Sequence, residues 1–414
     1  MNSPNLSKRD FLKAAAMLGA TAATPTLLSA QENDAARPAA GSSDGSELID
    51  PKFASVNAHG FMSDAIHLGE ESGFSVTPIY QAKNVKGAYQ RPPLNPTVDA
   101  FEVKMKSLEG GECAVSAPCG MSIITQIFLT FLSAGDRIVV HRCVYDNVMN
   151  LLRDHLPRFG VEVRFVDMND VANVRAALQE KRTKLVHFEP YVNPTCEVLN
   201  APAIIGVAKE AGALCSVDNT WLSPYLFQPL RHGADLVLHS ATKYLGGHGS
   251  AMGGVVSGSK DLVTSIEKTI GVMGGIIRPF DAFLLTQGLK TLRLRMKEHT
   301  ASALKVARFL ESHPKVARVR YGGLPSWDGH TTGSSYLRGF GGMMGVQWRD
   351  AKTHNTFGNR LKMCKPWVSL GDVVTLVSKR EPEPARGIPE RFTRISIGLE
   401  DAADIIADFR QALT

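Results

Sequence analysis

Residues 235–249 read DLVLHSATKYLGGHG, a short apolar run followed by a lysine and a group of glycines. The run 235–240 is rich in leucine and valine, which is typical of a buried strand. Ser240 and Thr242 are two residues apart, so in an extended stretch their hydroxyls point to one side and Lys243 to the other. The two hydroxyls suit a phosphate, and a partly desolvated lysine amine can form a Schiff base. Close approach of the backbone to a bulky ligand is allowed by the glycines that follow, Gly246, Gly247 and Gly249.

Apolar runs of the same kind recur through the middle of the chain. They are ECAVSA, RIVV, VEVRFV, KLVHFE and ALCSVD, and most are separated by segments with helical spacing, such as 171–181 and 202–211. This alternation predicts an α/β fold with a mostly parallel sheet covered by helices on both faces. Ligands of such sheets bind at the carboxyl ends of the strands. We therefore expect residues 240–243 to lie at the ligand-binding edge.

Two further segments indicate what this edge binds. Asp218 ends the run ALCSVD, and a carboxylate beside a pyridine nitrogen keeps that nitrogen protonated, which makes the ring an electron sink. Gly120 and Met121 lie between a strand and a helix, where the free N–H groups of the helix start form an anion site. A phosphate site, a ring partner and a reactive lysine together predict a site for pyridoxal 5′-phosphate.

The pattern changes after a helical pair near 281–310. Strand candidates at 342–348 and 393–397 flank a helix near 352–363, and a last helix covers 402–412. Such a mixture predicts a smaller α+β domain at the C-terminus. No internal repeat is present.

Composition excludes several other classes of protein. Hydrophobic residues make up 44% and charged residues 21% of the 414 residues, and the net charge of +6 is scattered, so we expect no nucleic acid partner. The six cysteines form no CxxC pair and no zinc spacing with histidine, so no metal is expected. No apolar run is long enough to predict a membrane span. A dinucleotide fingerprint GxGxxG after an early strand is also missing.

The N-terminus reads SKRDFLKAAAMLGATAATPTLLSAQ and differs from the rest. A basic pair, Lys8 and Arg9, precedes a weakly apolar, alanine-rich run, which resembles a twin-arginine export signal with Lys in place of the first Arg. We predict a signal peptide over 1–30 and a linker over 31–50, and hence a periplasmic or exported protein that uses the twin-arginine machinery. The alternative is a disordered or amphipathic arm on a cytoplasmic protein.

The stretch 217–249, VDNTWLSPYLFQPLRHGADLVLHSATKYLGGHG, resembles the trans-sulfuration (Cys/Met metabolism) family of pyridoxal phosphate-dependent enzymes. The similarity continues from AIHLGE at Ala65 to the end of the chain, through LEGGECAVSAPCGM, VSLGD and RISIGLE. The resemblance implies a fold-type-I transferase fold with a seven-stranded, mostly parallel sheet between helices. It also implies a subunit-contacting N-terminal arm over 51–97, a cofactor-binding domain over 98–294 and a C-terminal domain over 295–414.

The resemblance assigns roles at the cofactor. Lys243 matches the lysine that carries the cofactor as a Schiff base and later moves protons, and Asp218 matches the acid at the pyridine nitrogen. Tyr145 matches a tyrosine that stacks on the ring and carries protons. The phosphate cradle corresponds to Ser240, Thr242 and the N–H groups of Gly120 and Met121.

Other matches concern the neighbouring subunit and the substrate. Tyr89 and Arg91 match a pair that reaches the phosphate of a neighbouring subunit, which implies a homodimer or homotetramer with a shared active site. Arg394 matches the arginine that grips the substrate carboxylate, since a guanidinium fork fits a carboxylate. Asn193 and Ser369 are expected in the same region.

Departures from the family pattern concern the substrate. After Tyr145 the family has Gly-Gly-Thr, or Gly-Cys-Thr in methionine γ-lyases, whereas this chain has Asp146-Asn147-Val148. Before the Ser-Leu-Gly segment, Val368 stands where cystathionine γ-lyases have a glutamate for the distal amino group. The segment from Arg91 to Thr97 is one residue longer than usual.

We therefore predict an enzyme that cleaves a carbon–sulfur bond of a sulfur amino acid. Val368 favours methionine-like γ-elimination, which gives a 2-oxo acid, ammonia and a thiol. One alternative is a γ-replacement transferase of the cystathionine γ-synthase or O-acyl-homoserine sulfhydrylase type. The others are a cystathionine β- or γ-lyase and a cofactor-binding protein without turnover.

Overall fold

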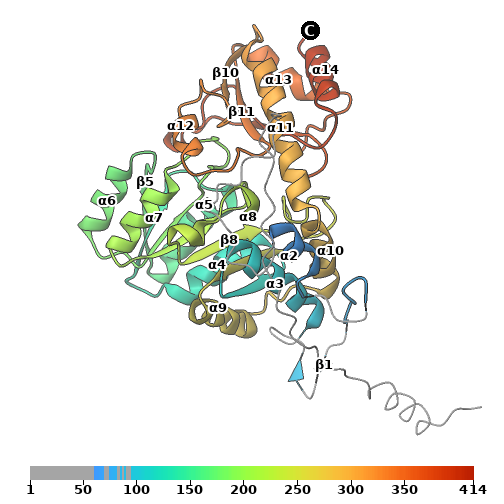
Figure 1. Cartoon of the computed structure of the whole chain (residues 1–414). Coiled ribbons are helices and arrows are strands. Elements are labelled where there is room, and N and C mark those ends of the chain that lie inside the picture. Colours follow the sequence, from blue (N-terminus) through green and yellow to red (C-terminus); the bar gives the residue numbers. More distant parts are fainter. Residues whose placement is uncertain (1–59, 70–73, 82–83, 86–87, 90–94) are drawn as a thin grey trace, which may run out of the picture. The chain divides into compact units, whose positions relative to one another are not determined.

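The computed structural model describes residues 60–69, 74–81, 84–85, 88–89 and 95–414 (Figure 1). The predicted signal, the predicted linker and Arg91 lie outside these residues. The shorter elements near the start and in the connections are α2 (Phe61–His67), β1 (Asn84–Val85), β2 (Ala88–Tyr89), α8 (Ser223–Leu226) and α12 (Gly329–Ser334).

A seven-stranded sheet lies in the part of the chain between residues 113 and 258, with strand order β3-β9-β8-β7-β6-β4-β5. Neighbouring strands among β4 to β8 pair in parallel, and β9 pairs antiparallel with both β8 and β3. The strands are β3 (Cys113–Ala117), β4 (Arg137–His141), β5 (Glu162–Val166), β6 (Leu185–Phe188), β7 (Leu214–Asp218), β8 (Leu236–Ser240) and β9 (Gly254–Gly258). The predicted fold class is confirmed, and the six apolar runs are six of these strands.

The seventh strand, β9, escaped the sequence analysis. Its sequence GVVSG contains two glycines and a serine, yet all five residues are buried. At Gly254 an added Cβ would lie 2.3 Å from the carbonyl oxygen of Cys119, the residue that precedes helix α4 (Gly120–Phe131). Only glycine allows the backbone of β9 to lie this close to the start of that helix. Because close packing requires glycine in this strand, its sequence has too few apolar residues to be recognised as a buried strand.

Helices cover both faces of the sheet and form two separate apolar clusters with it. One cluster joins α3, α6, α7 and α10 to residues such as Val139, and the other joins α4, α5 and α9 to its neighbours Ile138 and Val140. Side chains that alternate along a strand thus serve both layers. The helices are α3 (Pro96–Glu109), α4 (Gly120–Phe131), α5 (Asp146–Asn150), α6 (Val171–Glu180), α7 (Ala201–Glu210), α9 (Lys260–Met273), α10 (Pro279–Leu289) and α11 (Leu292–Glu311).

Local capping explains where the first long helix begins and ends. Asn95 accepts hydrogen bonds from the N–H groups of Thr97 and Val98, and proline occupies the first helical position. The helix ends at Gly110, whose φ of 75° is left-handed. An asparagine followed by proline, two residues before the first apolar residue Val98, is thus the local signal for the start of this helix.

A second, smaller sheet lies in the C-terminal part of the chain and is antiparallel throughout, with strand order β10-β11-β13-β12. Its elements are β10 (Val316–Arg320), β11 (Met343–Trp348), α13 (Ala351–Arg360), β12 (Leu376–Arg380), β13 (Phe392–Ser396) and α14 (Ala402–Ala412). The strands β10 and β12 were missed, since charged residues occupy part of each. Helix α11 contacts α8 beside the large sheet and β10 and β11 of the small sheet (Figure 1). The boundary at 294/295 between the two parts stays a prediction.

Neither a membrane span nor a metal cluster occurs among the described residues. No described helix is both long and apolar enough to cross a membrane. The same residues contain no group of three or more His, Cys, Asp or Glu side chains placed to hold a metal ion.

Helix α10 packs closely against residues 241–246, which carry Lys243 and are called the lysine segment below, and this packing gives a prediction about stability. In Gly288→Ala, the new Cβ in α10 would lie 2.4 Å from the carbonyl oxygen of Gly246 and 2.6 Å from that of Leu245. Because backbone must shift to relieve these contacts, we expect the free energy of unfolding to fall by about 1–3 kcal/mol in urea titrations.

The matched control is Gly206→Ala in α7, where no described atom lies within 4 Å of the new Cβ. There alanine should leave stability unchanged or raise it by up to about 1 kcal/mol, because glycine is a poor helix former. Equal unfolding midpoints for the two variants would show that the contact between α10 and the lysine segment does not constrain the fold.

Candidate active site

A cavity of about 690 Å³ opens at the carboxyl ends of the parallel strands. Parallel strands bring the residues that follow them to one edge of the sheet. The residues that line it include Tyr145 after β4, Glu189 after β6, Asp218 at the end of β7 and Lys243 after β8. The small sheet contributes Arg394 to the opposite side.

Lys243 lies in a series of turns after β8. Its Nζ donates a hydrogen bond of 2.7 Å to Oγ of Ser369. Burial lowers the pKa of the Lys243 ammonium, the positive charge of Arg394 lowers it further, and Asp372 partly opposes both. The environment therefore favours the neutral, nucleophilic amine.

The structure corrects one step of the sequence argument. Residues 241–246 form turns and not an extended stretch, so alternation along a strand does not decide where Thr242 and Lys243 point. The N–H of Gly253 donates to Oγ1 of Thr242 at 3.0 Å, which anchors the turn to the start of β9. Ser240, Thr242 and Lys243 nevertheless all line the same cavity.

Asp218 keeps one carboxylate oxygen available to a ligand. Its Oδ1 accepts hydrogen bonds from Oγ1 of Thr220 at 2.5 Å and from the N–H of Thr220 at 3.0 Å. Oδ2 accepts no hydrogen bond from the described residues. Burial raises the pKa of Asp218, and the two bonds from Thr220 oppose this rise. A protonated ring nitrogen would provide the missing donor, so the site fits the pyridine of pyridoxal phosphate.

The N-terminus of α4 lies against the end of β8. An added Cβ on Gly120 would be 2.8 Å from Cβ of Ser240, so only glycine lets the helix start come this close to the serine. Cys119 precedes the helix and makes no side-chain cap, which leaves the first N–H groups for a ligand. Together with the hydroxyls of Ser240 and Thr242, this arrangement fits a phosphate group.

Arg394 is held in position from two sides. Its Nη1 donates to Oδ1 of Asn193 at 2.9 Å, and its Nη2 donates to the carbonyl oxygen of Ser369 at 2.7 Å. Burial, followed by the charge of Arg380, lowers the pKa of Arg394 to about 10. Ser369 has a left-handed φ of 87°, and it contacts Lys243 through its hydroxyl and Arg394 through its carbonyl. The structure thus brings the predicted substrate residues together beside the lysine.

Two tyrosines from the sequence prediction have different surroundings. Tyr145 precedes α5 and lines the cavity, and its hydroxyl accepts a hydrogen bond of 3.2 Å from Nδ2 of Asn147. Tyr89 in β2 is 68% exposed and does not line the cavity within this one chain. Arg91, its predicted companion, lies outside the described residues.

Glu189 was not predicted from the sequence; it is buried, and it lies close enough to Asp218 for the two charges to interact. Oε1 accepts the N–H of Tyr145 and Oε2 accepts the N–H of Asn193, both at 2.7 Å. Burial, followed by the charge of Asp218, raises the pKa of Glu189. One carboxyl group therefore positions two loops of the site. The available signal was an acidic residue at the end of an apolar run, KLVHFE, which is also the signal that identified Asp218.

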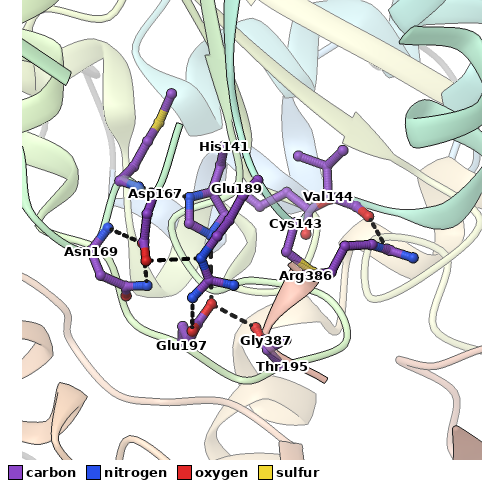
Figure 2. A network of polar contacts seen from close by, with 12 residues as sticks. His141, Cys143, Val144, Asp167, Asn169, Glu189, Thr195, Glu197, Arg386 and Gly387 are labelled. Atoms are coloured by element: carbon purple, nitrogen blue, oxygen red, sulfur yellow. Dashed lines mark hydrogen bonds and ion pairs between the residues drawn. The ribbon is translucent and has the colours of Figure 1, made fainter. Parts of the chain in front are cut away.

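Ion pairs and a hydrogen bond outside the cavity hold the segments that follow β4 and β6. Arg142 contacts Glu197 at 2.5 Å and Asp167 at 2.9 Å, which ties the end of β4 to the segment after Glu189 (Figure 2). Arg386 donates to the carbonyl oxygen of Val144 at 2.7 Å. These contacts come from parts of the chain far apart in sequence, so spacing alone could not predict them.

The position of Glu189 gives a second prediction. In Glu189→Gln the amide nitrogen cannot accept a hydrogen bond, so the N–H of either Tyr145 or Asn193 loses its partner. A protonated carboxyl would still offer both oxygens. We expect the free energy of unfolding to fall by about 1–3 kcal/mol, measured by urea titration. Glu381→Gln, at a side chain that is 81% exposed, is the control and should be neutral. A Glu189 variant as stable as this control would contradict the anchoring role.

Comparison with known proteins places this geometry in a family. The family model described as Cys/Met metabolism PLP-dependent enzyme matches residues 54–414, and the model of the twin-arginine translocation pathway signal sequence matches residues 5–25. A canavanine γ-lyase from Rhizobium leguminosarum bv. trifolii is 43% identical over 324 residues, which cover 75% of this chain and 80% of that protein. An L-methionine γ-lyase from Treponema denticola is 38% identical and covers 86% of this chain and 96% of its own length.

A solved structure agrees with the observed architecture. Cystathionine γ-synthase from Xanthomonas oryzae pv. oryzae, in complex with aminoacrylate and cysteine, has a TM-score of 0.82 and 31% identity, and it covers 86% of this chain and 98% of its own. The family model, the relatives and the solved structure all indicate the same family. The chain belongs to the Cys/Met metabolism family of pyridoxal phosphate-dependent enzymes, which are carbon–sulfur lyases and transferases.

Proposed function

We propose that the protein is a γ-lyase, which removes the substituent on Cγ of an L-amino acid. The products are a 2-oxo acid, ammonia and, for a sulfur substrate, a thiol. The observation that carries this proposal is the cavity that combines three features: the Lys243 amine with its lowered pKa, the available oxygen of Asp218 and the uncapped start of α4.

These residues have separate roles at the cofactor. Lys243 would hold it covalently, Asp218 would accept the proton on its ring nitrogen, and Tyr145 would cover the ring. The phosphate would be bound by Ser240, Thr242 and the N–H groups of Gly120 and Met121. When bound, pyridoxal phosphate supplies an electron-accepting ring that weakens the bonds of the substrate Cα and Cβ.

Three side chains act on the substrate itself. Arg394, fixed by Asn193 and Ser369, binds the α-carboxylate as a guanidinium fork. Lys243, whose pKa is lowered by burial and by the charge of Arg394, takes the proton from Cα, with the Ser369 hydroxyl 2.7 Å from its Nζ. The Tyr145 hydroxyl, which accepts a hydrogen bond from Asn147, would give a proton to the departing group.

The choice of γ-elimination rests on Val368 and on the relatives. Val368 lines the cavity beside Ser369 and has no group that could bind a distal amine. The two relatives described above are both named γ-lyases, one for canavanine and one for methionine. L-Methionine is therefore the first substrate to test.

Export and assembly are part of the same proposal. The match to a twin-arginine signal over residues 5–25 supports export, with cleavage after Ala30 and a site of action outside the cytoplasm. The exposed position of Tyr89 supports a homodimer or homotetramer in which Tyr89 and Arg91 reach the phosphate in a neighbouring subunit. The division into an arm, a cofactor domain ending at 294 and a C-terminal domain remains part of this proposal.

The test is product analysis with the purified full chain carrying pyridoxal phosphate. With L-methionine we expect 2-oxobutanoate and methanethiol. Lys243→Ala should reduce the rate by at least about 100-fold, the smaller effect typical of a lost general base. Pyruvate from L-cysteine or L-cystathionine in place of 2-oxobutanoate would indicate a β-lyase. Turnover of O-acetyl-L-homoserine only after sulfide is added would replace the γ-lyase with a transferase.

A further inference from the structure

A second arginine faces the cavity close to Arg394. In the small sheet Arg380 of β12 pairs with Phe392 of β13, and Ser378 pairs with Arg394. Arg380 and Arg394 are therefore diagonal neighbours on one face of the sheet, with Cα atoms roughly 7–8 Å apart. Both side chains line the cavity.

The two guanidinium groups differ in what they already bind. Arg394 uses Nη1 and Nη2 for Asn193 and Ser369, which orient it. Arg380 donates from Nη1 to Oδ2 of Asp146 at 3.0 Å, and within the described residues its Nη2 and Nε donate no hydrogen bond. Arg380 thus has donors to spare on a side chain that is 18% exposed.

The charge around Arg380 favours an anion. Asp146 is paired on its other oxygen with Arg386 at 2.9 Å, and Arg386 also pairs with Glu383, which contacts Arg153 at 3.5 Å. These pairs contain three guanidinium groups and two carboxylates, so the net charge of the group is +1. Both oxygens of Asp146 are occupied, which leaves little attraction for a cationic ligand.

The other charged groups of the cavity have assignments of their own. Lys243 and Asp218 serve the cofactor, Arg394 serves the α-carboxylate, and Glu189 accepts two backbone N–H groups. A methyl-ended side chain such as that of methionine would leave Nη2 and Nε of Arg380 without an acceptor, with Asp146 as the partner of Nη1. A second carboxylate would meet it, because the carboxylate carbons of an extended six-carbon dicarboxylate lie roughly 6 Å apart.

We propose that Arg380 forms a second anion subsite, so that the enzyme prefers γ-substituted amino acids whose distal end carries a carboxylate. This inference rests on the proposed γ-elimination and narrows its substrate class. The reaction itself is unchanged. The Cγ–S bond breaks, the thiol leaves with the bonding electrons and takes a proton, and water releases ammonia and 2-oxobutanoate.

Binding can be tested without turnover. L-2-Aminoadipate, L-norleucine and L-lysine have the same six-carbon chain with an anionic, neutral or cationic end, and none has a leaving group on Cγ. In calorimetry with the holoenzyme, L-2-aminoadipate should bind at least about tenfold more tightly than L-norleucine, which is the effect of one charge-assisted hydrogen bond. Arg380→Gln should abolish this difference and leave the affinity for L-norleucine within about threefold.

Lys379→Gln is the matched control. Lys379 precedes Arg380 on the same strand, its side chain points to the other face and is 47% exposed, and it pairs with Glu381 at 3.4 Å. The control removes one positive charge next to the subsite and should preserve the preference for L-2-aminoadipate. Because L-norleucine binding is measured in each variant, a misfolded protein cannot be mistaken for a lost subsite.

Measuring kcat/KM for two substrates tests the anion subsite and the γ-lyase activity separately. S-(Carboxymethyl)-L-homocysteine and S-ethyl-L-homocysteine share the Cγ–S bond and the product 2-oxobutanoate and differ in the distal charge. The first is the shortest thioether of this kind with a distal carboxylate, one atom longer than L-2-aminoadipate. We expect a higher kcat/KM for the carboxymethyl substrate, lowered about 10- to 100-fold by Arg380→Gln, with little change for the ethyl substrate.

Each outcome decides one of the two proposals. Equal affinities of the wild-type enzyme for L-2-aminoadipate and L-norleucine, or tighter binding of L-lysine, would overturn the anion subsite even if 2-oxobutanoate is formed. If L-2-aminoadipate binds through Arg380 but neither homocysteine derivative yields 2-oxobutanoate, the subsite is supported and the γ-lyase proposal fails.

Discussion

The parallel direction of strands β4 to β8 is the constraint on which the site depends. Because these strands share a direction, their carboxyl ends meet at one edge, and the chain turns there into the segments that carry Tyr145, Glu189, Asp218 and Lys243. An antiparallel neighbour would send its end to the far edge. The one reversed strand of the larger sheet, β9, returns the chain after the lysine segment and contributes no residue to that set.

Backbone contacts fix the lysine segment against the rest of the molecule. Arg295 of α11 donates from Nη1 to the carbonyl oxygen of Tyr244 at 2.6 Å, and from Nη2 to that of Gly288 at 2.7 Å. Burial lowers the pKa of this arginine to about 10, yet the carbonyl groups satisfy its donors. The turn after Lys243 is thus held by a buried cation and by close packing at Gly246, which keeps the amine in place.

The pKa values of the carboxyl groups around the cavity depend on whether an arginine pairs with them. Burial alone would raise the pKa of Asp146, but hydrogen bonds from Arg386 and the charges of Arg380 and Arg386 outweigh it and hold the pKa below its usual range. For Glu189 and Asp218 burial is the larger effect: it raises the pKa of each, and the charge of Arg386 only partly opposes the rise at Glu189. The carboxyl groups of the cavity thus differ, because hydrogen bonds from two arginines outweigh burial only at Asp146.

Short-range patterns in the sequence determined the strand–helix alternation, the lysine with its hydroxyl neighbours and the acid at the end of β7. These signals are local, because a buried strand appears as a short apolar run and the ligand-facing residue comes directly at or after its end. Partnerships across long separations were decided only by the tertiary structure. Glu189 accepts the N–H of Tyr145 from the segment after another strand of the large sheet, and Arg380 reaches Asp146 from the small sheet. The first contact depends on the order of the strands in the large sheet and the second on how the two sheets pack, and no spacing within a single element records either.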